Sequence, residues 1–235
     1  MKYKIWTFTL STLFALSGCG GGEDWASKDP SAIAASPNSF DIAGGWKQLV
    51  LKGYTKTLHF PLTNSTCEGS LQILQTPVEI YDATSFKYAF KNTLSYTERY
   101  YSCDSSTPRA TLNVYQNNWF SRDYGNSFFS VNADSGDWDT PAVFPQAARV
   151  GEIGVIGQLT SYNSTGAAAG IEKWTYSIEI DTATTAKFRL LMSAVDAAGQ
   201  WIGSEENVFR VAPDNNLTLI SVSKKYPSGF HIEAK

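Results

Sequence analysis

The stretch Lys173-Trp174-Thr175-Tyr176-Ser177-Ile178-Glu179-Ile180-Asp181 decides the fold. Every second side chain is apolar, and the residues between are polar or charged. A period of two residues is that of a β-strand with one buried face. Strands buried on one face are typical of antiparallel sheets.

The same alternation recurs on both sides of this stretch. A second apolar row comprises Phe188, Leu190, Met192 and Ala194, and Phe86, Tyr88 and Phe90 repeat the pattern in the first half. Turn-forming sequences such as Asp196-Ala197-Ala198-Gly199 separate the apolar runs. The second half is therefore predicted to be a meander of strands at 152–162, 171–181, 185–196, 201–211 and 216–224.

The length of these strands indicates how the sheet is shaped. They exceed the usual length of about five or six residues, and long antiparallel strands twist and curl. We expect residues 40–235 to form an all-β domain of long antiparallel strands, as a curved sheet, a half-open barrel or a two-sheet sandwich. Proline and asparagine breaks mark a candidate subdivision near 132–148. No segment shows a convincing helical period, and only a short helical turn near 141–148 is considered.

Composition excludes several classes of protein. The chain has 235 residues, of which 43% are hydrophobic and 17% charged, with a formal charge of −3. These values exclude a disordered chain, a coiled coil and a collagen-like fibre. An acidic chain without a basic stripe is not expected to bind nucleic acid.

The N-terminus has the features of a processed leader. Lys2 and Lys4 precede an uncharged, mostly apolar run from Ile5 to Leu16, which suits a signal peptide better than a membrane span. The run ends in Leu16-Ser17-Gly18-Cys19, which resembles the lipobox of bacterial lipoproteins. This resemblance implies that 1–18 is a signal peptide and that the new N-terminal Cys19 carries acyl chains such as palmitate. Several acyl chains anchor a protein stably, whereas one binds only marginally.

The residues after Cys19 indicate the destination. Gly20 stands where an aspartate favours inner-membrane retention in enterobacterial lipoproteins, so the resemblance implies lipid anchoring at the outer membrane. Both a periplasmic and a surface-facing orientation remain open. Residues 19–39 are rich in Gly, Ala, Ser and Pro, as expected of a flexible tether.

A second resemblance covers about residues 149–224. Val150-Gly151-Glu152-Ile153-Gly154, Asp181-Thr182-Ala183-Thr184-Thr185-Ala186 and Phe209-Arg210-Val211-Ala212-Pro213 are similar to stretches of uncharacterised putative lipoproteins of proteobacteria. These are turn and strand residues, so the resemblance implies a shared fold. It carries no assigned activity, and no functional residue is transferred.

Two cysteines remain besides Cys19. The periplasm is oxidising, so Cys67 and Cys103 are expected to form a disulfide. A catalytic or metal-binding thiol is the alternative, but it needs a basic neighbour or further ligands. His59 is the only histidine near either cysteine in the sequence.

Motifs for catalysis and metal binding are weak. The chain has only His59 and His231, and no Gly-x-Ser-x-Gly or His-Glu-x-x-His sequence. We therefore expect no catalytic residue, no metal and no cofactor. The stretch 132–139 offers several aspartate oxygens, and calcium binding within Asp134–Asp139 is left open although the spacing is not that of an EF-hand. A plain turn is the favoured interpretation there.

Acids and aromatic residues offer two further candidates. Glu98, Asp123, Asp137 and Asp139 lie near aromatic residues, as in glycosidases, but no spacing selects a pair. Aromatic side chains that are candidates to face a ligand or a partner are Tyr115, Trp119, Phe120 and Tyr124. Their alternative role is to fill the core and its rim.

The sequence thus predicts a non-enzymatic, lipid-anchored envelope protein of Gram-negative bacteria that binds an apolar ligand or an envelope partner. An apolar cradle would enclose a cavity of roughly 300–1,000 Å3. The alternative is a structural or assembly lipoprotein without a cavity, and a carbohydrate-active enzyme ranks below both.

Overall fold

The computed structural model describes residues 38–61, 68–101, 108–131, 134–140 and 142–235. These residues form one helix and thirteen strands. Their bounds are α1 Ile42–Lys52, β1 Tyr54–Pro61, β2 Glu68–Gln75, β3 Glu79–Ile80, β4 Phe90–Tyr101, β5 Pro108–Phe120, β6 Asn126–Val131, β7 Asp134–Trp138, β8 Ile153–Tyr162, β9 Ala168–Ile180, β10 Ala186–Asp196, β11 Trp201–Val211, β12 Leu217–Lys225 and β13 His231–Ala234.

The strands form one antiparallel sheet in which nearly every strand pairs with its neighbours in sequence. The exception is the short β3, which pairs with β4 beside the main path. The predicted all-β antiparallel fold is confirmed. Strands β8 to β12 lie within a few residues of the predicted meander, because the alternation and the turn sequences mark them clearly.

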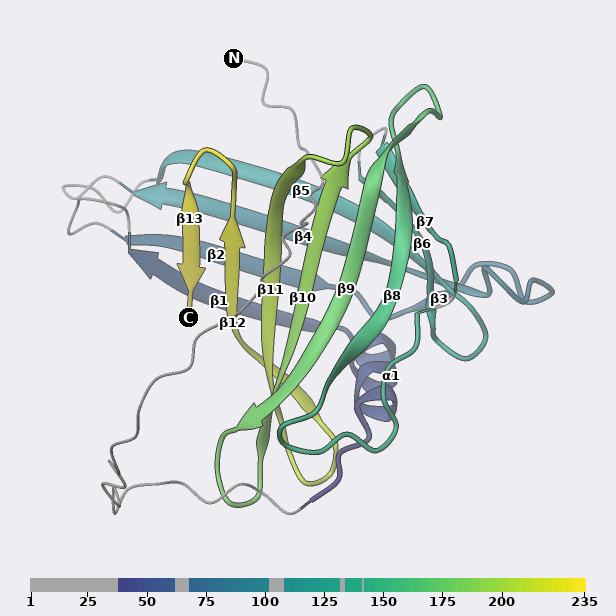
Figure 1. Cartoon of the computed structure of the whole chain (residues 1–235), viewed down its shortest axis with the longest axis vertical. Coiled ribbons are helices and arrows are strands. Elements are labelled where there is room, and N and C mark those ends of the chain that lie inside the picture. The colour runs from purple at the N-terminus through teal and green to yellow at the C-terminus, as the bar shows by residue number, and fades with distance from the viewer. Residues whose placement is uncertain (1–37, 62–67, 102–107, 132–133, 141) are drawn as a thin grey trace, which may run out of the picture.

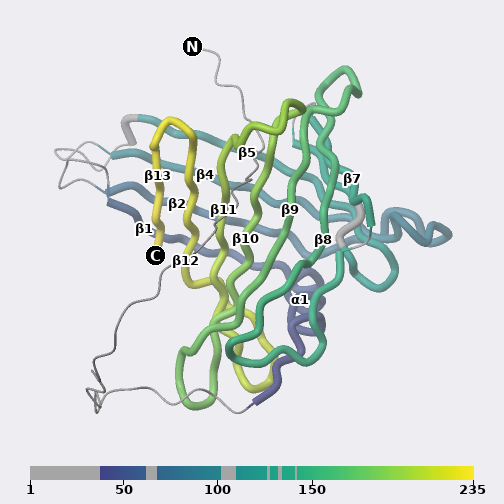
Figure 2. Tube along the Cα trace, viewed as in Figure 1, coloured from purple at the N-terminus to yellow at the C-terminus, as the bar shows by residue number. Residues whose placement is uncertain are grey.

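The sheet curls until its two ends meet. The backbone N–H of His59 in β1 donates to the carbonyl of Lys235 at 2.8 Å, and the N–H of Lys235 donates back to His59 at 2.8 Å. The sheet is thus nearly closed into a barrel. In Figure 1, β8 to β13 form a wall in front, and β1, β2, β4 and β5 cross behind it at a steep angle. The Cα trace in Figure 2 shows the same two walls.

Helix α1 covers the lower end of the barrel in Figure 1. The Asp41 carboxylate caps it by accepting a hydrogen bond from the Gly44 N–H at 2.8 Å. A Cβ on Gly45 would lie 2.3 Å from the Asn215 carbonyl, so a glycine lets the helix approach the turn between β11 and β12. The expectation of no helix here was wrong, because two glycines weaken the helical signal and tertiary packing overrides it.

The helical turn considered near 141–148 is also absent from the described residues 142–148. These residues are irregular, with bends at 146 and 147, and Ala148 forms an isolated bridge with Phe40. Strand β7 pairs with both β6 and β8, so a single sheet continues on either side of the candidate subdivision at 132–148.

The end of the barrel beside α1 is filled with apolar side chains. Trp46 of α1 stacks on Phe144 with ring centroids 4.5 Å apart and meets Phe209 edge-on at 6.4 Å. Phe188 is fully buried between Phe144 and Phe209. We call this half, which is closed by α1, the sealed half of the barrel.

Candidate functional site

In the other half of the barrel, polar inward side chains stand among buried apolar ones such as Leu71 and Val222. The polar group, here called the interior cluster, consists of Tyr96 and Glu98 of β4, Glu172 of β9, Glu205 and Asn207 of β11, and Lys224 of β12. Cross-strand register places these residues on the inner face. For example, Glu98 pairs with the fully buried Leu71, and Glu205 pairs with both Met192 and Lys224.

Lys224 joins the two walls of the barrel. Its Nζ lies 2.9 Å from Glu98 Oε1 and 3.7 Å from Glu205 Oε2. The side chains of Lys224, Glu98 and Glu205 are 12%, 6% and 23% exposed. Burial alone would lower the pKa of Lys224, but the carboxylates of Glu205 and Glu98 outweigh it and raise that pKa.

Tyrosine and asparagine side chains hold the two carboxylates in place. The Tyr100 hydroxyl donates to Glu98 Oε2 at 2.9 Å, and the Asn207 amide donates to Glu205 Oε1 at 3.0 Å. Tyr96 lies under Lys224, whose Nζ is 4.8 Å from the ring centroid, and its hydroxyl reaches Glu205 at 3.5 Å. Burial and the neighbouring glutamate raise the pKa of Tyr96 and of Tyr100, so both hydroxyls remain donors.

Glu172 is the titratable member of the interior cluster near neutral pH. Burial raises its pKa to about 7, the hydrogen bond from the Trp174 indole acts in the opposite direction, and the charge of Glu205 raises it further. A carboxyl group with this pKa exchanges its proton in the physiological range. The net charge of the cluster therefore changes by one unit around neutrality.

Part of the inner face beside the interior cluster is in contact with solvent. Leu112 of β5 pairs with Glu98, so its side chain faces inward, yet it is 46% exposed. Val114, the next inward residue of β5, is only partly buried. These side chains therefore form a solvent-exposed rim at this end of the barrel. We call this part, with the interior cluster as its floor, the open half of the barrel.

Two buried acceptors face this half without a hydrogen-bond partner among the described residues. One is Asn207 Oδ1, beside the amide nitrogen that binds Glu205. The other is Ser161 Oγ of β8, whose residue is 5% exposed and pairs with Gly170, two positions before Glu172. Buried polar atoms are rarely left unpaired, so each of these two offers a hydrogen-bonding position on the inner face.

The predicted aromatic residues do not form one site. Tyr115 is exposed on the outer face of β5, and Trp119 packs on the outside against Tyr81 and Phe128. Phe120 belongs to the buried core. Tyr124 stacks on Phe90 at 4.7 Å, with Lys47 Nζ 4.8 Å from its ring centroid. The core and rim role considered as the alternative fits Phe120 best.

Of the four candidate acids only Glu98 faces the interior, whereas Asp137 and Asp139 lie close together, since Asp137 pairs with Thr160 and the Thr160 hydroxyl donates to Asp139. Asp137 pairs with Lys87 at 2.9 Å, and Asp139 accepts hydrogen bonds from Gln158 and Thr160 at 2.8 Å. The Ser121 hydroxyl donates to Asp123. Residues 134–138 form strand β7, so the plain turn favoured there is wrong, and the calcium loop that was left open is not formed by these residues.

The remaining predicted residues carry little chemistry. Within the part of the chain that the structure describes, no three His, Cys, Asp or Glu residues are grouped to hold a metal ion. His231 Nε2 lies 3.1 Å from Ser223 Oγ, and His59 is exposed on β1. Cys19, Cys67 and Cys103 lie outside the described residues, so the lipidation site and the disulfide stay predictions.

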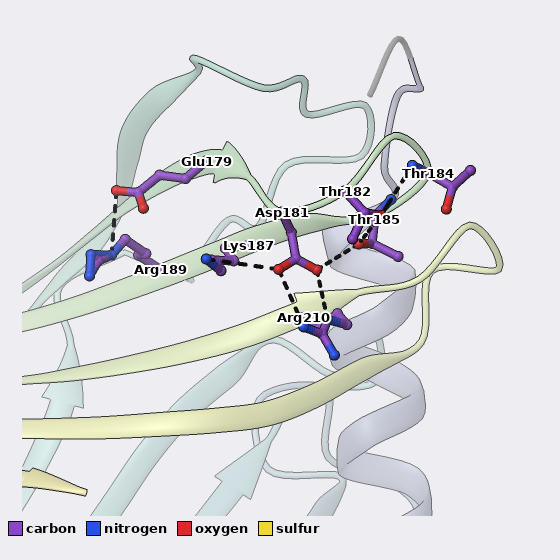
Figure 3. A network of polar contacts seen from close by, with 8 residues as sticks. All are labelled: Glu179, Asp181, Thr182, Thr184, Thr185, Lys187, Arg189 and Arg210. Carbon is purple, nitrogen blue, oxygen red and sulfur yellow. Dashed lines mark hydrogen bonds and ion pairs between the residues drawn. The ribbon is translucent and has the colours of Figure 1, made fainter. Parts of the chain in front are cut away.

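The outer face of the front wall carries charged side chains in ion pairs. Arg189 Nη2 lies 3.2 Å from Glu206, and Arg189 Nε lies 3.4 Å from Glu179. Figure 3 shows the contact between Arg189 and Glu179 beside Asp181, which is bound by Arg210 at 2.7 Å. A shallow hollow of 490 Å3 adjoins these pairs. Its lining combines charged residues, among them Lys187, Arg189, Glu206, Lys225 and Glu233, with the apolar Val208 and Ile220, so it is not the purely apolar cradle that the sequence predicts.

Sequence reasoning missed Glu172, Glu205 and Lys224, although one signal was present. Each charged residue lies an even number of positions from apolar residues on the inward face of its strand, as Glu172 does from Trp174 and Ile178. A charge in such a position indicates a buried polar site rather than a solvated face.

Comparison of the chain with family models, with curated proteins and with solved structures gives no match. Among the described residues, α1 is too short to cross a membrane, and no other helix is found that could.

Proposed function

We propose that this protein is a lipid-anchored envelope protein of Gram-negative bacteria that binds a small ligand, without catalysis, in the open half of its barrel. The observation that carries the proposal is the exposed inner side of β5 at Leu112, directly beside the buried pair of Glu98 and Lys224. The lipobox ending in Cys19 supports the anchor and the outer-membrane location.

The chemistry of the site favours binding over catalysis. Glu98, Glu205 and Lys224 bind one another, which suits a fixed recognition surface better than a free nucleophile or base. Leu112 and Val114 offer an apolar wall above this polar floor. The proposed ligand is therefore amphipathic, which differs from the apolar ligand that the sequence predicts.

The test is a search for the natural ligand in protein purified from its own membranes. The full chain is extracted with organic solvent, and the extract is analysed by mass spectrometry. The control is protein that has been unfolded, washed to remove any bound ligand, and refolded in the absence of membrane lipids. A small molecule present at near-stoichiometric amount only in the first extract supports the proposal, and two empty extracts contradict it.

The lipid anchor has its own test. Cys19→Ser removes the acylated sulfur, so the protein should leave the outer-membrane fraction. Mass spectrometry of the wild-type N-terminus should show the acyl chains on Cys19. Alkylation before and after reduction tests the predicted bridge, since Cys67 and Cys103 should react only after reduction.

A second candidate function is partner binding on the outside of the barrel. Ile80, Tyr81 and Phe86, in and after β3, are exposed large apolar side chains. Such a patch is typical of an interaction surface. If this surface binds a partner, Phe86→Ala should abolish a crosslink to an envelope protein. Substitution of Leu112, inside the barrel, should leave that crosslink unchanged.

A further inference from the structure

We infer that the open half of the barrel takes a ligand that carries a protonated amine, and that Glu172, Glu205 and Asn207 receive it. The inference rests on the proposed function and names its ligand class. The first observation is the balance of charge in the interior cluster. The interior cluster holds three carboxyl groups, those of Glu98, Glu172 and Glu205, but only the one cation of Lys224 among the described residues.

An excess of carboxylate inside a barrel is unfavourable unless it is paired. Glu98 already receives Lys224 at 2.9 Å and the Tyr100 hydroxyl at 2.9 Å, while Lys224 reaches Glu205 only at 3.7 Å. Glu205 is also the most exposed of the three residues in this ion-pair network. A cation arriving from the open half would therefore meet Glu205 with unused pairing capacity.

Two of the unpartnered buried atoms can accept a hydrogen bond: the Asn207 amide oxygen only accepts, whereas the Ser161 hydroxyl can both donate and accept. Asn207 Oδ1 and Ser161 Oγ are buried, and neither has a partner among the described residues. Ser161 is nine-tenths buried and faces inward from β8, next to the strand of Glu172. An ammonium group has three N–H donors and no acceptor, so it could satisfy Asn207 Oδ1 and a carboxylate together.

An anionic ligand fits the same place poorly. Lys224 is held between two glutamates and lies over the Tyr96 ring at 4.8 Å, so it has little capacity left for a further anion. A carboxylate or phosphate would also approach Glu172 and Glu205. Like charges that are brought close together in a buried site repel each other strongly.

Glu172 makes this recognition depend on pH. Glu205 and Tyr96 interact with it from β11 and β4, and Tyr54, Glu98 and Lys224 surround those two groups. The tyrosines and Lys224 have pKa values raised further above neutrality, so they keep their protons between pH 6 and pH 8. Glu172, with its pKa at about 7, gains its charge over this interval and should then attract a cation more strongly.

The experiment compares three water-soluble probes of equal chain length: hexylammonium, hexanol and hexanoate. Binding to the full-length protein in lipid nanodiscs is measured by titration calorimetry, with empty nanodiscs subtracted. Hexylammonium should bind at least about tenfold more tightly than either other probe. Its affinity should rise about tenfold from pH 6 to pH 8, in proportion to the ionised fraction of Glu172.

Two variants locate the effect. Glu172→Gln keeps an acceptor for the Trp174 indole and leaves the Lys224 pairs intact, so the protein should fold. It should remove the pH dependence and weaken hexylammonium binding about fivefold or more at pH 8. Glu206→Gln removes one negative charge from the outer face of β11, where Glu206 pairs with Arg189, and should leave binding unchanged.

The outcomes separate this inference from the proposed function. If hexanol or hexanoate binds as tightly as hexylammonium, the amine is excluded but the open half still binds a ligand. If Glu172→Gln and Glu206→Gln weaken hexylammonium equally, the attraction comes from overall charge and the inference is contradicted. If no probe binds, the amine inference is overturned. The proposed function is contradicted only if the solvent extract of the membrane-purified protein also contains no ligand.

Discussion

The two halves of the barrel are built from the same strands but differ in what their inner faces carry. Strand β11 brings Phe209 and Val211 into the sealed half and Glu205 and Asn207 into the open half. Packed apolar side chains stabilise a fold, whereas buried ions cost desolvation energy that their pairing often fails to recover. The difference suggests that the sealed half maintains the structure and that the open half is retained for binding.

A second comparison sets the inside of the barrel against its outside. Lys224 and Arg189 are each a cation held between two glutamates. The first group is buried, whereas Arg189 is 32% exposed in the outer network of Figure 3. The same arrangement of charges therefore exists in two environments within one protein, and substitutions can compare them directly.

The largest effect is expected in the sealed half. Phe188→Ala leaves a cavity among Phe144, Tyr176 and Phe209 and should lower the free energy of unfolding by about 3–5 kcal/mol. Leu112→Ala, in the open half, should cost less than about 1 kcal/mol because that side chain is already half exposed. Chemical denaturation followed by tryptophan fluorescence measures both, and equal losses would contradict the division into two halves.

Removal of the buried cation should be nearly as costly. Lys224→Met leaves Glu98 and Glu205 inside the barrel without their ion-pair partner, and we expect a loss of about 3 kcal/mol. Adding Glu98→Gln to this variant should restore part of the stability, because one uncompensated charge is then gone. A double variant less stable than Lys224→Met alone would mean that Glu98 does not interact with Lys224 as the geometry indicates.

The pH dependence of stability tests Glu172. Its pKa is about 7 in the folded protein and near 4.5, the ordinary value of a glutamate side chain, in the unfolded chain. Between these values the folded state binds more protons, so stability should fall as pH rises from about 4.5 to 7 and then level off, a loss of roughly 3 kcal/mol. Chemical denaturation at several pH values gives the free energy of unfolding of wild type and of Glu172→Gln. The change with pH in the difference between these two free energies measures the loss. A difference that does not vary with pH would place Glu172 in contact with solvent.

The smallest effect is expected on the outer face. Arg189→Met removes the pairs with Glu179 and Glu206 and should cost less than about 1 kcal/mol. The cost should shrink further at high salt, since exposed pairs are screened. Denaturation at low and at high ionic strength measures it, and a loss as large as that of Lys224→Met would remove the distinction between the two environments.

Much of the fold follows from the sequence because alternation and turn chemistry are local signals. They placed strands β8 to β12 within a few residues. Helix α1 was missed because its stability comes from contacts with distant residues, such as the approach of Gly45 to Asn215.

The interior cluster could not be predicted in the same way. Glu98 was one of four candidate acids, and its partner Lys224 lies 126 positions away. The register shift at Val208 and Phe209 also changes which side chains of β12 face inward, so that Leu219 and Val222 share a face. Only the closed sheet brings these residues together.

Native mass spectrometry of the wild-type protein beside Leu112→Trp tests the central claim most directly. An indole at position 112 would fill the open half without disturbing the sealed half, and Ile153→Trp, at an exposed outer position, is the matched control. We predict a bound small molecule on wild type and on Ile153→Trp but not on Leu112→Trp, with all three equally stable. A ligand that persists on Leu112→Trp, or is absent from all three proteins, would contradict binding in the open half.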